Sequence, residues 1–177
     1  MLFATHLLVA AGIGWLSGRP RVRRRLADGS RGSAAGALST GWLVAGAALP
    51  DVVDKPLGAL GVFDVYQSVG HSALLVPLAA LVAVAARRRG LAVAVGWGSH
   101  LALDALHMVA NGRPGDAAFL GWPLLTRSDP LAIPPGEFAL FYVGTPSFFL
   151  EVALWLTAVS LVLRSRFAVK IDRRHGR

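Results

Sequence analysis

Five apolar stretches, separated by short basic or turn-rich segments, constrain the fold of this 177-residue chain more than any other feature. They cover residues 2–16, 34–50, 71–86, 91–110 and 148–163. An α-helix needs about 20 residues to cross the roughly 30 Å core of a bilayer, so the shorter stretches require local thinning or burial among their neighbours. We therefore predict an all-α fold: one integral membrane domain (residues 1–177) that forms a polytopic helical bundle of about five spans. A water-soluble bundle of five helices that are apolar all round is the alternative.

The composition favours the membrane interpretation. Hydrophobic residues make up 54% of the chain, charged residues only 16%, and the mean hydropathy is +0.55. Soluble domains carry about 25% charged residues, so this chain has too little polar surface to coat a globule. The formal net charge of +8 does not indicate nucleic-acid binding, because the Lys and Arg residues lie in short runs between apolar stretches with almost no aromatic residues among them.

The basic residues predict the orientation of the spans. Six Arg lie in residues 18–33, three in residues 87–89, and six Lys or Arg in the tail at residues 164–177. If the five spans alternate, these residues share one side, and the opposite side keeps only Lys55, Arg113 and Arg127. The positive-inside rule then predicts a multi-pass protein of the cell membrane with its N-terminus outside and a basic cytoplasmic tail. The first stretch carries its positive charge after the apolar run, unlike a signal peptide, and is predicted to be a retained helix.

Two connections fall on the predicted outer side. Residues 51–70 contain Pro56 and several Gly, which suggests a broken or re-entrant segment. Residues 111–146 contain six Pro and are predicted to form an irregular extracytoplasmic loop. Within this loop, the run at residues 137–143 fits either a hairpin strand or an interfacial segment.

Ionisable residues in the apolar stretches and at their ends gather on the outer side. Within a membrane such residues cost about 2.5–3.5 kcal/mol at a helix centre, so they are candidates for function. This clustering is an independent result, because the orientation rests on Lys and Arg alone. The chain has no Cys, so a metal ion must be held by His, Asp, Glu or water. The set consists of His6, Asp51, Asp54, His71, His100, Asp104, His107 and Glu151.

The fourth stretch carries the sharpest local pattern. His100, Asp104 and His107 are spaced i, i+4 and i+7, so they share one helix face. The first pair can ligate one ion, and His107, one turn further out, can serve a second ion or a substrate. A hydrogen-bonded pair between helices would leave the same pattern, but the other His and Asp residues predicted on this side favour a metal site. Nitrogen and carboxylate ligands without sulfur suit zinc, and also manganese or iron.

Several of these residues also have purely structural interpretations. Asp51 alone could be a turn residue or a helix C-cap, and Asp54 could form an ion pair with Lys55 or Arg113. Glu151 fits a charge at the membrane interface, and His6, close to the N-terminus, fits a solvated side chain. Ser72 fits a helix-start hydroxyl better than a nucleophile, because no His lies at a convincing base position for a triad.

The order and spacing of the motifs resemble the YdjM-like family of membrane-bound metal-dependent hydrolases. The resemblance covers residue 1 to about residue 125, and it implies a hydrolase that depends on a metal ion. The chain departs from the family pattern at residues 68–70, where Ser-Val-Gly replaces the Arg-Gly-Thr that often stands there. The matching motifs are Thr5-His6, Leu49-Pro50-Asp51-x-x-Asp54, Gly70-His71-Ser72, Ser99-His100-x-x-x-Asp104 and Trp122-Pro123-Leu124.

The ordered set of His and Asp residues is also similar to the zinc-dependent phospholipase C and single-strand nuclease superfamily. That similarity implies one or more divalent ions, with zinc favoured. It implies one ion held by Asp51 or Asp54 together with His71, His100 and Asp104. A second ion would share Asp104 with His6, and His107 and Glu151 would take the role of additional or supporting ligands.

These features predict a metal-dependent hydrolase with its active site at the extracytoplasmic face, acting on a phosphoester such as a phospholipid or a lipid-linked headgroup. Asp54 or Asp51 would be the general base, and Lys55, Arg113 or Arg127 would bind the phosphate. The expected partners are membrane lipid and a small-molecule or lipid substrate, without nucleic acid. Two alternatives remain open. An ion or proton transporter would need polar residues in the cytoplasmic halves of the spans, and a non-enzymatic protein would use the polar cluster only to hold helices together.

Overall fold

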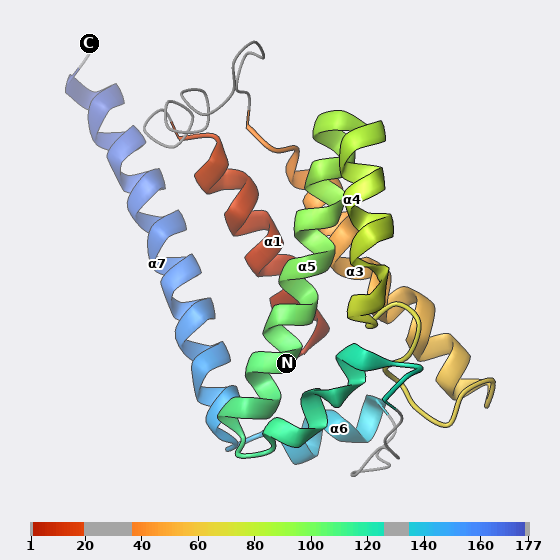
Figure 1. Ribbon diagram of the computed structural model, residues 1–177. Coiled ribbons are helices and arrows are strands. Elements are labelled where there is room, and N and C mark those ends of the chain that lie inside the picture. Colours follow the sequence, from red (N-terminus) through yellow and green to blue (C-terminus); the bar gives the residue numbers. More distant parts are fainter. Residues whose placement is uncertain (1, 20–36, 126–134, 176–177) are drawn as a thin grey trace.

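The computed structural model describes residues 2–19, 37–125 and 135–175, and every regular element within these ranges is a helix, which confirms the all-α prediction (Figure 1). In chain order the elements are α1 (Phe3–Ser17), α3 (Thr40–Ala59), the short 3₁₀ helix η1 (Ala73–Leu75), α4 (Val76–Ala85), α5 (Arg87–Ala110), the 3₁₀ helix η2 (Pro114–Gly121), α6 (Pro135–Tyr142) and α7 (Pro146–His175). The hairpin strand considered for residues 137–143 is wrong, because this run belongs to α6 up to Tyr142. Pro135 is the first residue of α6, where the proline ring favours the start of a helix.

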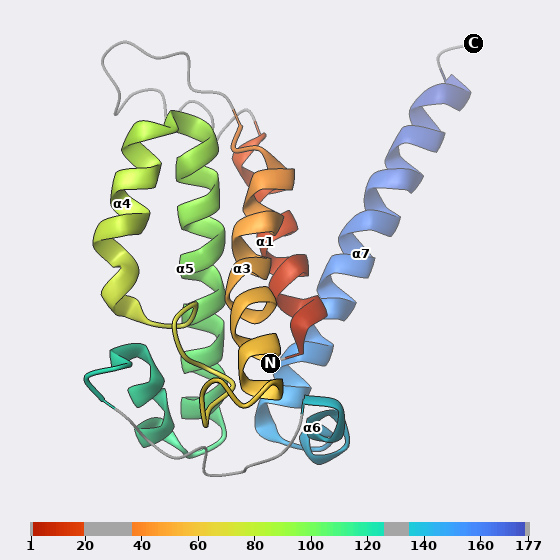
Figure 2. The same cartoon turned by 90° about the vertical axis from the view of Figure 1, so that its right-hand side faces the viewer.

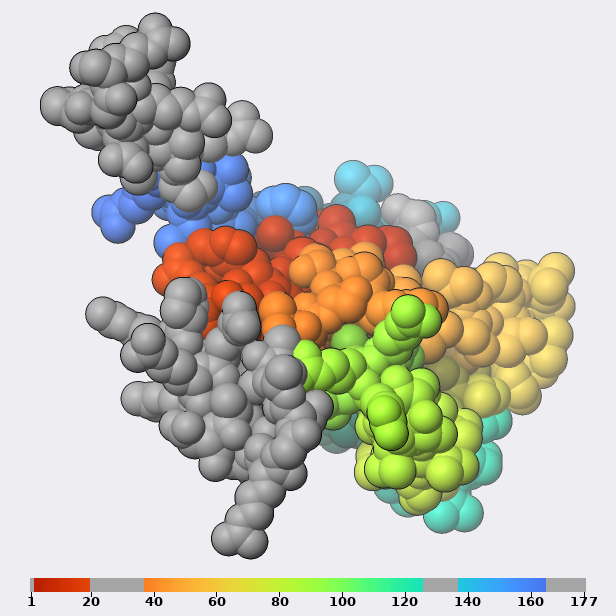
Figure 3. Space-filling view, turned by 90° about the horizontal axis from the view of Figure 1, so that it is seen from above, coloured from red at the N-terminus to blue at the C-terminus, as the bar shows by residue number. Residues whose placement is uncertain are grey.

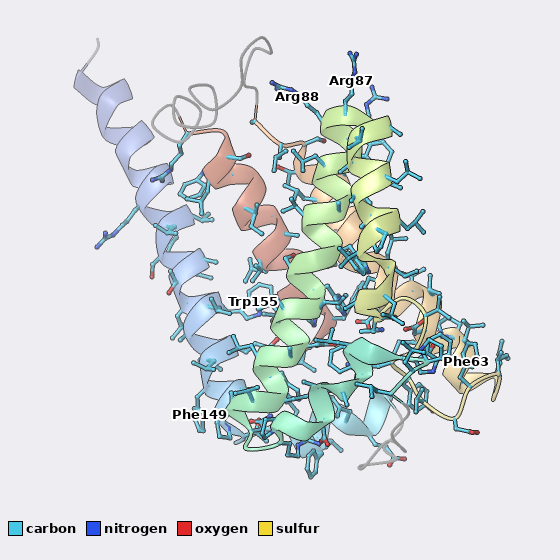
Figure 4. The ribbon with its side chains drawn as sticks, viewed as in Figure 1. Phe63, Arg87, Arg88, Phe149 and Trp155 are labelled. Carbon is cyan, nitrogen blue, oxygen red and sulfur yellow. The ribbon has the colours of Figure 1, made fainter. Side chains whose placement is uncertain are left out.

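The helices form a bundle with α5 at its centre. α5 packs against α1, α3, α4 and η2. Both ribbon views show α1, α3, α4 and α5 side by side along one direction, with η2 and α6 gathered at one end (Figures 1 and 2). α7 meets the bundle at that end and leans away from it toward the C-terminus (Figure 2). Arg87 and Arg88, at the turn between α4 and α5, lie at the opposite end of the bundle (Figure 4).

α3 and α5 approach each other closely because both carry glycine at the contact. A Cβ atom on Gly46 would lie 2.1 Å from the carbonyl oxygen of Val93, and one on Gly96 would lie 2.0 Å from that of Leu43. Small residues let helix backbones pack directly against each other, without large side chains between them. This close contact brings the side chain of His100 within reach of the α3 backbone.

Three helices extend beyond the apolar stretches that predict them. α5 begins four residues earlier, at Arg87, and α7 runs to His175 through the basic tail. α3 continues nine residues past residue 50, with Pro50 and Pro56 inside it. Tertiary hydrogen bonds to Asp54, described below, stabilise this last part of α3 against the loss of two backbone donors. The broken segment expected from residue 51 therefore begins only after α3 ends.

The distribution of side chains is inverted relative to a water-soluble bundle. Among the described residues, twelve polar or charged residues are buried but only nine hydrophobic ones, and three of those nine are alanine. Large hydrophobic side chains cover the outer faces instead, as Val84 (78% exposed) and Leu156 (63% exposed) illustrate. Large apolar side chains exposed in this number are typical of a surface that contacts lipid or another protein.

One helix in the described ranges is long and apolar enough to cross a membrane by its length and composition, namely Pro146–Arg164 of α7. The apolar helices Phe3–Ser17 and Ala73–Ala85 are shorter. α3 and α5, with 20 and 24 residues, are long enough to cross a membrane. They are less apolar than α7's span, because they carry ionisable residues of the candidate site.

Candidate metal centre

The five side chains predicted as metal ligands meet in one place between the helices. His6 comes from α1, Asp51 from α3, His100 and Asp104 from α5, and His71 from the segment before η1. They form two overlapping groups, in each of which the candidate ligand atoms lie within 4.8 Å of one another: His6 with His100 and Asp104, and Asp51 with His71 and His100. The structure therefore confirms that buried His and Asp residues able to hold a metal ion come together here.

Four atoms define what we call the four-atom site: Nε2 of His71, Nε2 of His100, Oδ1 of Asp51 and Oδ2 of Asp104. The two nitrogens lie 3.2 Å apart. His71 Nε2 lies 3.6 Å from the Asp51 oxygen and 3.5 Å from the Asp104 oxygen. His100 Nε2 lies 4.0 Å and 3.6 Å from the same two oxygens. Around a tetrahedral ion with ligand bonds of about 2.0–2.2 Å, ligand atoms are about 3.3–3.6 Å apart. The five distances from the two ring nitrogens, 3.2–4.0 Å, are close to that spacing.

Asp54 orients the ring of His71. Its carboxylate lies 2.7 Å from His71 Nδ1 and also accepts the backbone N–H groups of Ser68 (2.7 Å), Gly70 (2.9 Å) and His71 (3.2 Å). A carboxylate bonded to one ring nitrogen of a ligand histidine fixes the ring and makes the other nitrogen more basic. Asp54 is fully buried and is directed at the far side of His71, so in this structure it supports a ligand and does not join the ligand groups.

The backbone of α3 orients the ring of His100. His100 Nδ1 lies 2.7 Å from the carbonyl oxygen of Ala47. A carbonyl oxygen can only accept a hydrogen bond, so Nδ1 carries the proton and Nε2 of His100 presents a lone pair to the four-atom site. The contact exists because Gly46 and Gly96 allow α3 and α5 to approach so closely.

The four-atom site consequently gathers hydrogen-bond acceptors around one point. When both rings are neutral with their protons on Nδ1, the two Nε2 atoms face each other with their lone pairs. The two carboxylate oxygens beside them have one cation or donor each, Lys55 at Asp51 and Gln67 at Asp104. Acceptors removed from water cost free energy unless a donor or a cation compensates them. A divalent cation held by the two ring nitrogens and the Asp104 oxygen, with the Asp51 carboxylate beside it, would compensate these acceptors, so the residues present fit a bound divalent ion.

Asp104 connects the four-atom site to His6. The second carboxylate oxygen, Oδ1, lies 3.2 Å from His6 Nε2. The ring of His6 stacks on the ring of His100 with 3.8 Å between centroids and 17° between planes. Nδ1 of His6 is buried and has no hydrogen-bond partner among the described residues. Asp104 therefore places one carboxylate oxygen beside the four-atom site and the other beside His6.

Residues 60–72 and 114–125, which we call the cap, cover the four-atom site. Gln67 in the cap donates a hydrogen bond of 2.8 Å to Asp104 Oδ2. The ring of Phe119 meets that of His71 edge-on, with 6.0 Å between centroids. Sequence reasoning missed Gln67, because it lies in an irregular segment without helical periodicity. The only signal was a polar amide four residues before His71.

The two residues predicted as additional ligands lie outside both ligand groups. Glu151 is buried and accepts a hydrogen bond from the hydroxyl of Thr5. His107 Nδ1 lies 2.8 Å from Ser147 Oγ, which also accepts a hydrogen bond of 2.8 Å from Asn111. These contacts join the start of α7 to α1 and α5. A ligand role for Glu151 or His107 therefore stays a prediction, while their role in holding α7 is visible.

Of the three cations predicted to bind phosphate, Lys55 lies beside the site. Its Nζ is 3.5 Å from Asp51 Oδ1, and its side chain is 38% exposed. Arg113 forms an ion pair of 3.0 Å with Asp116, and Arg127 lies outside the described residues. The Asp51 side chain is 13% exposed, more than any other candidate ligand, so the site reaches the surface at Asp51 and Lys55.

Comparison with known proteins adds nothing to this geometry. No protein-family model, curated protein or solved structure matches the chain. The resemblance to the YdjM-like family stays a prediction, and the function has to be inferred from the site itself.

Proposed function

We propose that this protein is a metal-dependent hydrolase of the membrane, with its active site at the extracytoplasmic face and a phosphoester as its substrate. The observation that carries the proposal is the convergence of two imidazole nitrogens and two carboxylate oxygens in the four-atom site. A divalent ion bound there lowers the pKa of a coordinated water to near 7 and polarises a phosphoryl oxygen. The motif order that resembles the YdjM-like family is consistent with this chemistry.

The residues of the chain have separate roles in this proposal. His71, His100 and Asp104 hold the ion, and Asp54 keeps His71 in position. Asp51 is the better candidate for accepting a proton, because it is the candidate ligand nearest the surface, whereas the Asp54 carboxylate already takes part in four hydrogen bonds. Lys55, next to Asp51, binds the negative charge of the phosphate.

The membrane placement is also part of the proposal. The apolar outer faces of the bundle and the span in α7 support it. The basic turn with Arg87 and Arg88 lies at one end of the bundle, and Phe63 of the cap lies at the other (Figure 4). With the basic end in the cytoplasm, the cap and the four-atom site face outward. The spans would be α1, α3, α4, α5 and α7. The bilayer would be thinned around α4, which at 10 residues is about 15 Å long, and around α1, which at 15 residues is about 22 Å long.

Metal analysis of matched histidine variants tests the proposal. Wild-type protein, purified in detergent without chelator, should contain a divalent metal by elemental analysis and should hydrolyse bis(p-nitrophenyl) phosphate. His100→Ala should lose both the metal and the hydrolysis. His107→Ala is the control, because His107 is a buried histidine on the same helix but outside both ligand groups, and this variant should keep its metal. A folded wild type that contains no metal and takes up neither zinc, manganese nor cobalt would refute the proposal.

A further inference from the structure

We propose that an exposed edge of the cap and of α3, formed by Val52, Leu60, Val62 and Leu124 and here called the apolar flank, lies in the outer leaflet and binds the acyl chain of a lipid phosphoester. The headgroup of that lipid would then reach the four-atom site. This inference rests on the proposed function and narrows its substrate class from any phosphoester to one carried by a lipid.

The apolar flank is exposed in a part of the chain that should be polar if it faced water. The exposed fractions are 61% for Val52, 78% for Leu60, 56% for Val62 and 77% for Leu124. All four residues lie outside the five apolar stretches, in connections on the predicted outer side. Connections in contact with water are normally rich in polar and turn-forming residues, and exposed apolar patches mark contacts with membranes or partners. The chain around residue 60 projects beyond the helices on one side of the molecule (Figure 3).

The two parts of the apolar flank belong to one surface. The ring of Phe63 meets that of Trp122 edge-on, with 5.2 Å between centroids. This contact places the segment with Leu60 and Val62 beside the segment with Leu124. The Ser72 hydroxyl donates a hydrogen bond to the carbonyl oxygen of Trp122, which ties both segments to the residue after His71. The segment with Leu124 is therefore linked, through Trp122 and Ser72, to the part of the chain that carries His71.

The charge next to the apolar flank matches an anionic amphiphile. Lys55 follows Val52 by one helical turn and precedes Leu60 by five residues, about 7.5 Å along α3. Its ammonium group lies against Asp51, at the point where the four-atom site reaches the surface. A phosphate at Lys55 and the metal would thus leave an attached acyl chain at Leu60 and Val62. A symmetric contact between two copies fits less well, because it would bring Lys55 of both chains into one apolar interface.

Spin labels test the location of the apolar flank without any reference to catalysis. The chain has no Cys, so Leu60→Cys, Leu124→Cys and Asp64→Cys each create a single labelling site. Asp64 is the control, because it is exposed in the same segment but polar. In nanodiscs of phosphatidylethanolamine and phosphatidylglycerol, labels at residues 60 and 124 should collide more with oxygen than with a water-soluble nickel complex, and the label at residue 64 should do the reverse. Nickel accessibility equal to that at residue 64 would overturn the inference, and so would labels that neither reagent reaches, because that result would place protein on the flank.

Ligand binding to the cobalt-substituted protein tests the acyl-chain contact. Phosphatidic acid in the nanodiscs should change the visible cobalt spectrum at a lower concentration than glycerol 3-phosphate does. In the variant Leu60→Ser/Leu124→Ser, the apparent affinity for phosphatidic acid should fall by about tenfold or more, since each leucine loses most of its apolar contact area. The affinity for glycerol 3-phosphate should stay unchanged, because this molecule has no acyl chain.

The two experiments separate failure of this inference from failure of the proposed function. If the protein takes up no cobalt, the proposed function fails, while the spin labels still decide where the flank lies. If cobalt binds but the variant affects both phosphates equally, or affects neither, the acyl-chain contact is refuted and the metal centre stands.

Discussion

Asp54→Asn is the most informative single substitution in the candidate site, because it alters the support of a ligand without removing the ligand. The asparagine has nearly the same shape but only one acceptor oxygen. Oδ2 of Asp54 currently accepts hydrogen bonds from Ser68 N, His71 N and His71 Nδ1, and Oδ1 accepts one from Gly70 N. The best orientation keeps the amide oxygen at the Oδ2 position, which places the amide NH₂ group opposite the N–H of Gly70.

Two separate losses follow from this geometry. Two donors face each other in a fully buried place, which should lower the free energy of unfolding by about 1–3 kcal/mol. The loss of the carboxylate from His71 Nδ1 should weaken metal binding by about 10–100-fold. At about 1.4 kcal/mol per tenfold, that is about 1.4–2.8 kcal/mol of binding free energy. Removal of a ligand itself, as in His71→Ala, should have a larger effect on metal binding.

Competition with a chromogenic zinc chelator measures the affinity, and the melting temperature of the metal-free protein measures the stability. Asp64→Asn, an exposed aspartate in the cap, serves as the control and should change neither quantity. A folded Asp54→Asn protein with wild-type zinc affinity would refute the assignment of Asp54 as the group that positions His71. A variant that keeps full zinc affinity but loses all hydrolysis would instead favour Asp54 as the general base.

Three further predictions concern packing, the attachment of α7 and topology. Gly96→Val should lower the melting temperature strongly, by an equivalent of about 1–3 kcal/mol or more, because the valine Cβ would overlap the α3 backbone. The control Gly98→Ala should have little effect, because the space around Gly98 is open. Ser147→Ala should lower the melting temperature, by an equivalent of about 1–3 kcal/mol, because it removes the hydrogen bonds that the hydroxyl makes with His107 and Asn111. The metal content measured on the same sample should not change. In intact cells, a membrane-impermeant maleimide should label Asp64→Cys and should not label Arg89→Cys; labelling of Arg89→Cys alone would reverse the proposed orientation.

Much of the candidate site could be predicted from the sequence, because ionisable residues stand out in stretches that are otherwise apolar. His and Asp residues within apolar stretches are costly in a bilayer, so their mere presence marked His6, His71, His100 and Asp104 as functional candidates. Placement of these residues on one side followed from the distribution of Lys and Arg along the chain. The structure brings all four into the two ligand groups, together with Asp51.

The division of roles between Asp51 and Asp54 could not be predicted. The two residues lie three positions apart on one helix, and the sequence pattern treats them alike. The difference arises because the cap folds back onto α3 and presents the N–H groups of Ser68 and Gly70 to Asp54, while Asp51 is left beside Lys55. The extension of α3 through two prolines depends on the same contacts, which local propensity does not contain.

The sequence by itself determined which residues avoid water and which bear charge, and hence the helical class, the basic end and the set of candidate ligands. Only the tertiary structure decided which atoms face one another: His71 and His100 across 3.2 Å, and Asp104 between them and His6. The physical reason is that hydrophobicity and helix propensity act locally along the chain. The distance between His71 and His100 depends instead on how closely α3, which holds His71 through Asp54, packs against α5, and Gly46 and Gly96 allow that close packing.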